Sequence, residues 1–186
     1  STRNQLAAEG AAGVSHHVAL SIVGLERAPT NGYFRAKLAQ EKLIKESSIS
    51  YSIIRATQFM EFLKGIADSS MVDNAVHIAP VRFQPIAAED VASAVSKVAM
   101  GTPLNGTIEI AGPEQFRFDE FIRRGLSARN DPREVVTDPH APYFGAELDE
   151  GTLVPAGAAQ LGATSFEAWL EQSTTQAPPV AAAKTV

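Results

Sequence analysis

Three residues in the first quarter of the chain, Ser21, Tyr33 and Lys37, have the types and the spacing that proton transfer requires. If residues 32–46 form a helix, Tyr33 and Lys37 lie on one face, because positions i and i+4 are neighbours on a helix. An ammonium beside a phenol favours the phenolate, which lowers the pKa of the tyrosine from about 10. We therefore expect Tyr33 to exchange a proton near neutral pH and Ser21 to bind the substrate oxygen. The same spacing also fits an ordinary amphipathic helix with an exposed lysine and a packed tyrosine.

A strand–helix–strand unit is predicted to position these residues. Residues 17–23 are almost entirely apolar, which indicates a strand of a parallel sheet covered on both faces. A loop over 24–32, a helix over 32–47 and a strand over 50–55 follow, joined by a right-handed crossover. Within the helix, we expect an exposed ion pair between Glu41 and Lys45.

The four residues at the C-terminal end of the second strand of this unit form a second candidate site. Open parallel sheets bind ligands at the carboxyl ends of their strands, and the residues that lie there are Arg55, Ala56, Thr57 and Gln58. A polar turn leading into a helix is the alternative interpretation of this stretch.

The rest of the sequence continues the alternation of strands and helices, which predicts an α/β fold with a parallel sheet. Helices are predicted over 2–12, 59–69, 88–100 and 118–128 and from Ser165 onward; strands or extended pieces are predicted over 75–79, 83–86, 107–111 and 134–137. Asp138 and His140 lie in a proline-containing loop, where they could form an acid–base pair or act as metal ligands. No third ligand accompanies them, so we favour a solvated loop and predict no metal site.

Composition excludes several classes of protein. The chain has 186 residues, a net charge of −5 and no cysteine. This length suits a single domain or most of one, and the negative charge disfavours nucleic acid. Disulfides and thiol chemistry are excluded, and no apolar run approaches the length of a membrane span. We therefore expect a cytoplasmic protein without membrane or nucleic-acid partners.

Ser21, Tyr33 and Lys37, with the segments HHVALSIVG, GYFRAKLAQEKLI, YSIIRATQF and QPIAAEDVASAV, resemble the atypical, NmrA-like branch of the short-chain dehydrogenase/reductase superfamily. The resemblance implies the last three strands of a Rossmann sheet with a small substrate lobe. It also implies NAD- or NADP-dependent oxidoreduction of a small carbonyl or alcohol. Tyr33 would transfer the proton, Lys37 would lower its pKa and contact the nicotinamide ribose, and Ser21 would position the substrate. Ser21, Tyr33 and Lys37 would also contact the cofactor, as would Arg55, Ala56, Thr57 and Gln58. A non-catalytic protein that senses NAD(P), or an interaction protein, is the alternative.

The sequence departs from this family in one respect. The family begins with a strand and a Gly-x-x-Gly-x-x-Gly turn that holds the pyrophosphate, whereas Gly10 and Gly13 give only Gly-x-x-Gly after a predicted helix. We therefore expect a truncated form that is inactive or nearly so alone. Residues 1–128 would be the later part of a Rossmann domain, with substrate-lobe segments interleaved at about 59–86. Residues 129–172 would complete the small lobe, and 173–186 would be a disordered tail. The uncovered edge of strand 17–23 would pair with another chain or form a homo-oligomer.

Overall fold

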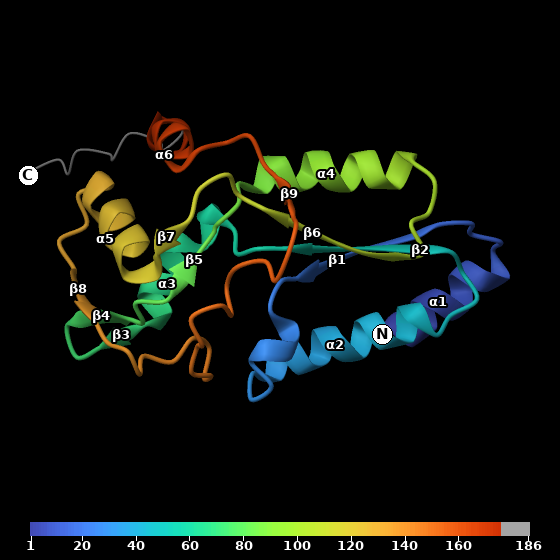
Figure 1. The fold of residues 1–186 in the computed structure, drawn as a ribbon, viewed down its shortest axis with the longest axis horizontal. Coiled ribbons are helices and arrows are strands. Elements are labelled where there is room, and N and C mark those ends of the chain that lie inside the picture. The colour runs from blue at the N-terminus through green and yellow to red at the C-terminus, as the bar shows by residue number, and fades with distance from the viewer. Residues whose placement is uncertain (176–186) are drawn as a thin grey trace, which may run out of the picture.

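A four-stranded sheet in the order β1-β2-β6-β9 forms one half of the molecule (Figure 1). The computed structural model describes residues 1–175. All neighbouring strands of this sheet run parallel. Its strands are β1 (His17–Ile22), β2 (Tyr51–Ala56), β6 (Gly106–Ala111) and β9 (Gln160–Leu161). The predicted α/β class with a parallel sheet is thus confirmed.

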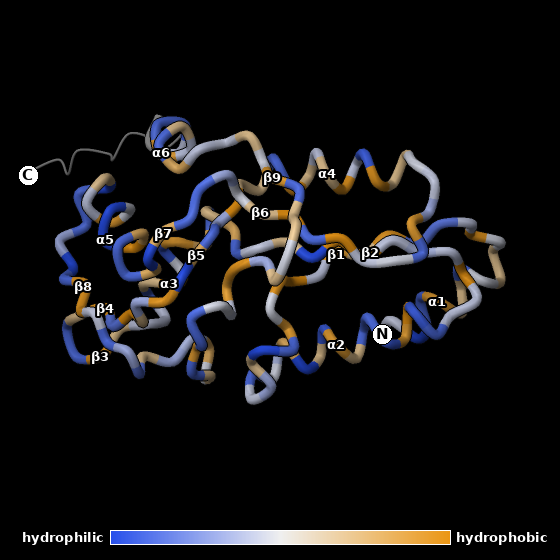
Figure 2. The backbone as a smooth tube through the Cα atoms, viewed as in Figure 1, coloured by the Kyte–Doolittle hydropathy of each residue, from blue (hydrophilic) through white to orange (hydrophobic). Residues whose placement is uncertain are grey.

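Helices cover both faces of this sheet. Two of them, α1 (Thr2–Ala11) and α2 (Gly32–Lys45), lie on one face, and α4 (Ala88–Met100) lies on the other (Figure 1). Neighbouring residues of β2 point to opposite faces: Ile53 packs in the cluster beneath α1 and α2, whereas Ile54 packs in the cluster beneath α4. Figure 2 shows that the hydrophobic residues of α4 lie on the side toward the sheet. Apolar strands are therefore stabilised by burial on both sides, as the unbroken apolar pattern predicts.

The other half of the molecule is a smaller lobe built around aromatic side chains. Its elements are η2 (Met60–Phe62), α3 (Leu63–Ser69), β3 (Met71–Val72), β4 (Ala75–Ile78), β5 (Arg82–Phe83), β7 (Phe116–Arg117), α5 (Phe118–Ala128), β8 (Glu134–Thr137) and α6 (Phe166–Thr175). The strands form two small sheets, β3-β4-β8 and β5-β7. Phe83 stacks on Phe118 with ring centroids 4.3 Å apart, and Phe121 lies 4.4 Å from Phe166. These rings join segments that are far apart in sequence into one core.

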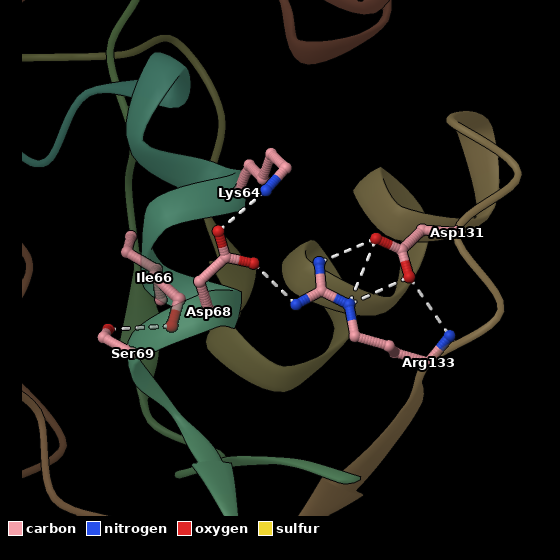
Figure 3. Close-up of polar contacts among 6 residues, drawn as sticks. All are labelled: Lys64, Ile66, Asp68, Ser69, Asp131 and Arg133. Carbon is pink, nitrogen blue, oxygen red and sulfur yellow. Dashed lines mark hydrogen bonds and ion pairs between the residues drawn. The ribbon is translucent and has the colours of Figure 1, made fainter. Parts of the chain in front are cut away.

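Polar contacts tie the outer elements of the lobe together. Arg133, which precedes β8, donates to Asp68 of α3 at 2.7 Å and to Asp131 at 2.7 Å (Figure 3). Asp68 also accepts from Lys64 one helical turn earlier, at 2.8 Å. The α3 helix is thereby linked to the segment between α5 and β8.

Most predicted helices and strands lie within one or two residues of their observed bounds, but the extended piece predicted over 83–86 is a strand only at Arg82–Phe83. The predicted helix over 59–69 begins only at Leu63, because Phe59 is extended and forms a bridge with Ile86. The short strands β3, β7 and β9 are not among the predicted elements. Helix α6 extends to Thr175, so residues 173–175 of the predicted tail are helical. The remainder of that predicted segment, residues 176–186, lies outside the described part of the chain. No helix within residues 1–175 is both long and apolar enough to span a bilayer.

Candidate functional site

A pocket of about 570 Å³ lies at the carboxyl ends of β1 and β2, which face the smaller lobe (Figure 1). It is lined by residues of β1, α2, the segment after β2, and a loop between β8 and β9. Six of the seven residues predicted to form a site line it: Ser21, Tyr33, Lys37, Ala56, Thr57 and Gln58. The structure therefore brings together residues that are as many as 37 positions apart in the sequence.

The start of α2 determines where Tyr33 lies. Asn31 caps the helix, since its side-chain oxygen accepts the Phe34 N–H at 3.1 Å. Tyr33 is thus held in the first turn at the pocket, with 62% of the residue exposed. Its hydroxyl has no hydrogen-bond partner among the described residues, which leaves the phenol free to bind a ligand.

Lys37 lies one turn beyond Tyr33, but its ammonium is engaged elsewhere. The Nζ atom donates to the Leu20 carbonyl at 2.8 Å and to the Gln40 side chain at 2.5 Å. Burial lowers the pKa of Lys37, and the nearby carboxylate of Glu41 partly offsets this effect. Within residues 1–175, the expected contact between this ammonium and the Tyr33 phenol does not form. That Lys37 lowers the pKa of Tyr33 therefore stays a prediction.

Ser21 is buried at the end of β1, where it donates a hydrogen bond to a carboxylate that the helical pattern predicts to be exposed. The Ser21 hydroxyl donates to Glu41 at 2.7 Å, and Glu41 is only 2% exposed. The pair with Lys45 does form, at 3.1 Å, but the predicted exposure of Glu41 is wrong. The Ser21 hydroxyl has a single proton, and that proton is donated in the hydrogen bond to Glu41. Toward the pocket Ser21 therefore presents only lone pairs and can accept a hydrogen bond there.

Arg55 explains why a carboxylate is tolerated at this depth. In register with Ser21 across β1 and β2, it donates to Glu41 through Nε and Nη2, both at 2.8 Å. It also contacts Glu26 at 2.7 Å. Burial by itself would raise the pKa of Glu41, but hydrogen bonds from Arg55 and Ser21 outweigh it and hold that pKa below its usual value. Pairing with Glu41 raises the pKa of Arg55. Among the seven predicted site residues, Arg55 alone does not line the pocket. It lies beside Ser21 on the neighbouring strand β2.

Two buried polar atoms at the pocket lack partners within residues 1–175, the hydroxyl oxygen of Thr57 and the amide nitrogen of Gln58. Thr57 is 2% exposed and Gln58 is 8% exposed. Tyr143 donates its hydroxyl to the Gln58 side-chain oxygen at 3.2 Å, which leaves the Gln58 nitrogen as the unpaired donor. A buried polar group without a partner costs about 1–3 kcal/mol, so a ligand that pairs with these atoms recovers that free energy.

Aromatic rings form the side of the pocket next to the smaller lobe: Phe59, Phe62, Tyr143 and Phe144. We call these four residues the aromatic wall. Phe59 and Phe62 stack with centroids 5.3 Å apart, and Tyr143 meets Phe144 edge-on at 4.7 Å. The sequence predicts that Tyr143 and Phe144 lie in a loop, but no local pattern links positions 143 and 144 to the ends of the strands.

The other titratable candidates lie away from this pocket. Asp138 contacts the His77 ring at 3.2 Å, and it accepts the backbone N–H of His140, rather than its ring, at 3.0 Å. Those two contacts, the backbone one first, lower the pKa of Asp138. Within residues 1–175, no cluster of three or more His, Asp or Glu side chains could hold a metal ion.

Solved structures share this fold at low sequence identity, while no family model and no curated protein matches the sequence. A new type of NADPH-dependent quinone oxidoreductase from Escherichia coli superposes with a TM-score of 0.67 at 17% identity, over 93% of this chain and 72% of that one. A short-chain dehydrogenase/reductase superfamily protein from Agrobacterium tumefaciens with bound NAD gives 0.61 at 17% identity, over 94% and 70%. The triphenylmethane reductase of a Citrobacter species gives 0.54 at 17% identity, over 74% and 49%. The chain thus spans between about half and three quarters of the lengths of these structures, with which it shares the Rossmann-type fold.

Proposed function

We propose that this chain forms the proton-transfer and substrate-binding part of an NAD(P)-dependent oxidoreductase of the NmrA-like, short-chain dehydrogenase/reductase type. The observation that carries the proposal is the convergence of Ser21, Tyr33 and Lys37 with Thr57 and Gln58 on one pocket at the strand ends. In open parallel sheets, this is where ligands bind. The substrate is a small carbonyl compound or alcohol. NADPH, NADP or NAD is bound in several of the similar solved structures, including the E. coli enzyme complexed with NADPH.

The residues of the pocket fit a nicotinamide dinucleotide. A carboxamide has both a donor and an acceptor, which complement the unpaired Thr57 oxygen and Gln58 nitrogen. Ala56 would contact the ring beside them, and Tyr33 and Lys37 would hold the ribose. Bound there, the dinucleotide supplies the hydride. Residues 1–186 contain no Gly-x-x-Gly-x-x-Gly sequence, so we expect weak binding and little turnover by this chain alone.

The chain's own residues handle the proton and the substrate oxygen. The free hydroxyl of Tyr33 donates a proton to a carbonyl oxygen during reduction and takes it back from an alcohol during oxidation. Ser21 accepts a hydrogen bond from the alcohol form of the substrate, because the Ser21 hydroxyl already donates its proton in the hydrogen bond to Glu41. Arg55 keeps Glu41 ionised and in place, and therefore acts on the substrate only through Ser21.

A non-catalytic NAD(P) sensor is the second candidate, and the position of Lys37 favours it. An ammonium committed to Leu20 and Gln40 does not activate the phenol in the arrangement described. The two candidates differ in whether turnover depends on the Tyr33 hydroxyl.

Calorimetric titration with NADPH and NADH, followed by turnover measurements on Tyr33→Phe, tests the proposal. We expect dinucleotide binding to survive the substitution and turnover to fall about 100-fold, measured in the 186-residue chain or in any longer form that binds the dinucleotide. Tyr51→Phe is the matched control, because Tyr51 lies on β2 outside the pocket. Binding without turnover, or turnover that Tyr33→Phe leaves unchanged, would favour the sensor.

A further inference from the structure

The lining of the pocket is uncharged apart from one side chain. Among the described residues that line it, Lys37 alone carries a charge, and its ammonium already contacts two oxygens. No guanidinium from residues 1–175 lines the pocket, although phosphate and carboxylate groups are commonly bound by one. The pocket is therefore poorly suited to a substrate that carries phosphate or carboxylate groups.

Two rings of the aromatic wall are left open toward solvent. Phe62 is 55% exposed and Phe144 is 62% exposed, although both line the pocket. They come from segments more than 80 positions apart in the sequence, so no single local element accounts for their gathering. Exposed aromatic rings at a pocket offer large, flat contact surfaces to a ligand.

The backbone at Phe144 indicates that its ring has a role beyond the turn. Phe144 has a φ of +46° and Gly145 a φ of +82°. Tyr143 and Ala146 exchange backbone hydrogen bonds of 2.8 and 3.2 Å across them. Positive φ at both central positions defines a type I′ turn, in which asparagine followed by glycine is preferred. A bulky side chain is an outlier in this conformation, and such strain is concentrated at ligand-binding sites.

We propose that the pocket takes a planar, uncharged aromatic carbonyl compound, such as a quinone or an aryl ketone, whose ring packs against Phe62 and Phe144. The assignment of its carbonyl oxygen to the Tyr33 hydroxyl rests on the proposed function. The packing of its ring rests only on the aromatic wall. The substrate class therefore follows from the rings and from the lack of an available cation at the pocket.

Calorimetric titration of the 186-residue chain with 1,4-naphthoquinone, with and without NADPH, tests this assignment. The chain has no cysteine with which a quinone could form an adduct. We expect saturable binding at one site, with the saturated ketone trans-1-decalone and the charged nucleotide sugar UDP-glucose each bound at least about fivefold more weakly.

Phe144→Asn separates recognition of the ring from maintenance of the fold. Because asparagine suits the turn better than phenylalanine, the midpoint of thermal unfolding should stay the same or rise, while naphthoquinone binds at least about fivefold more weakly. Phe62→Leu should weaken binding in the same direction. Met100→Asn is the control, because it replaces another exposed apolar residue far from the pocket.

The outcomes separate this inference from the proposed function. Absence of naphthoquinone binding in both conditions, equal binding of decalone, or undiminished binding by Phe144→Asn overturns the substrate class, and NADPH binding then still supports the oxidoreductase. Naphthoquinone binding that depends on Phe144 in a chain that binds no dinucleotide supports the aromatic site independently of the dinucleotide assignment, which is then tested in a longer form of the chain.

Discussion

Ser21 shows how a neighbour decides what a hydroxyl can do. Its oxygen lies at the pocket, but its hydroxyl proton is donated in a hydrogen bond to Glu41, which in turn accepts hydrogen bonds from Arg55. A serine without such a carboxylate can donate to a carbonyl oxygen, whereas this one can only accept a hydrogen bond from a ligand. Glu41 is therefore a positioning residue whose charge sets the direction of the hydrogen bond at Ser21.

Replacing Glu41 by glutamine should destabilise the fold in a pH-dependent manner. At about pH 7 we expect a loss of about 3 kcal/mol in the free energy of unfolding, because Arg55 loses a buried partner. The pKa of Glu41 is lower in the folded chain than in the unfolded one. The stabilisation is therefore fully present above the unfolded pKa of about 4.3 and is lost as the pH falls through the folded pKa.

Urea unfolding of the wild type and of Glu41→Gln at several pH values from about 7 down to about 3 measures this effect. The difference between the two proteins should shrink toward the acidic end. Glu46→Gln is the control, since Glu46 lies on the same segment but is exposed and pairs with Lys42 at 3.8 Å, an interaction worth less than about 1 kcal/mol. A difference that is independent of pH would contradict the assigned role of the Glu41 charge.

At the scale of elements, the end of β6 is fixed by close contact between backbones. A Cβ atom on Gly112 would lie 1.7 Å from the Pro85 carbonyl oxygen. The Gly112 carbonyl accepts a hydrogen bond from the Gln84 side chain at 2.8 Å. The segment that contains Gln84 and Pro85 continues into Ile86, which forms a bridge with Phe59 of the aromatic wall. Only a residue without a side chain allows β6 to approach the segment that positions this wall.

Gly112→Ala should therefore lower the free energy of unfolding by about 3 kcal/mol, at the upper end of what overpacking costs. Gly65→Ala is the matched control: nothing lies within 4 Å of a Cβ on Gly65, which is in the middle of α3. Alanine there should stabilise the chain by about 0.5–1 kcal/mol, because glycine is a poor helix former. Denaturant unfolding of both variants checks the contrast; equal stability would show that the backbones can separate at Gly112 without cost.

The elements themselves could largely be predicted from sequence, because their apolar patterns are local. The bounds of α4 and α5 match the predicted 88–100 and 118–128. The contacts between elements could not be predicted in this way. Glu41 and Lys45 have the spacing of an exposed pair, and only the packing of α2 on Arg55 of β2 buries the carboxylate. Likewise, Tyr143 reaches Gln58 across 85 positions through the packing of the smaller lobe.

At the scale of the whole molecule, β1 is an edge of the four-stranded sheet. The N–H groups of His17 and Val23 donate inward, to Ser50 and Ala56. Because N–H groups alternate in direction along a strand, those of Val18, Leu20 and Ile22 point outward. Lys37 covers the outward Leu20 carbonyl, but the other groups of this edge have no strand beside them among the described residues.

We expect the 186-residue chain to self-associate through this edge as its concentration rises. Sedimentation velocity over a wide concentration range measures the association. Val18→Pro should reduce it, since proline removes an outward N–H without removing a hydrogen bond between β1 and β2. A chain that remains monomeric at every concentration would show that β1 does not act as a pairing edge.

The turn at Phe144 and Gly145 has a consequence for how such a protein changes over generations. Its two central residues lie between Tyr143 and Ala146, which exchange backbone hydrogen bonds, so we expect a mutation there to leave the strands and the start of α2 undisturbed. Preference for one substrate over another can then drift by single replacements in a short exposed turn, while the chemistry at the strand ends is inherited intact. Exchanging these two residues between related chains would likewise let an engineer change the preferred substrate without changing the residues that carry out the reaction.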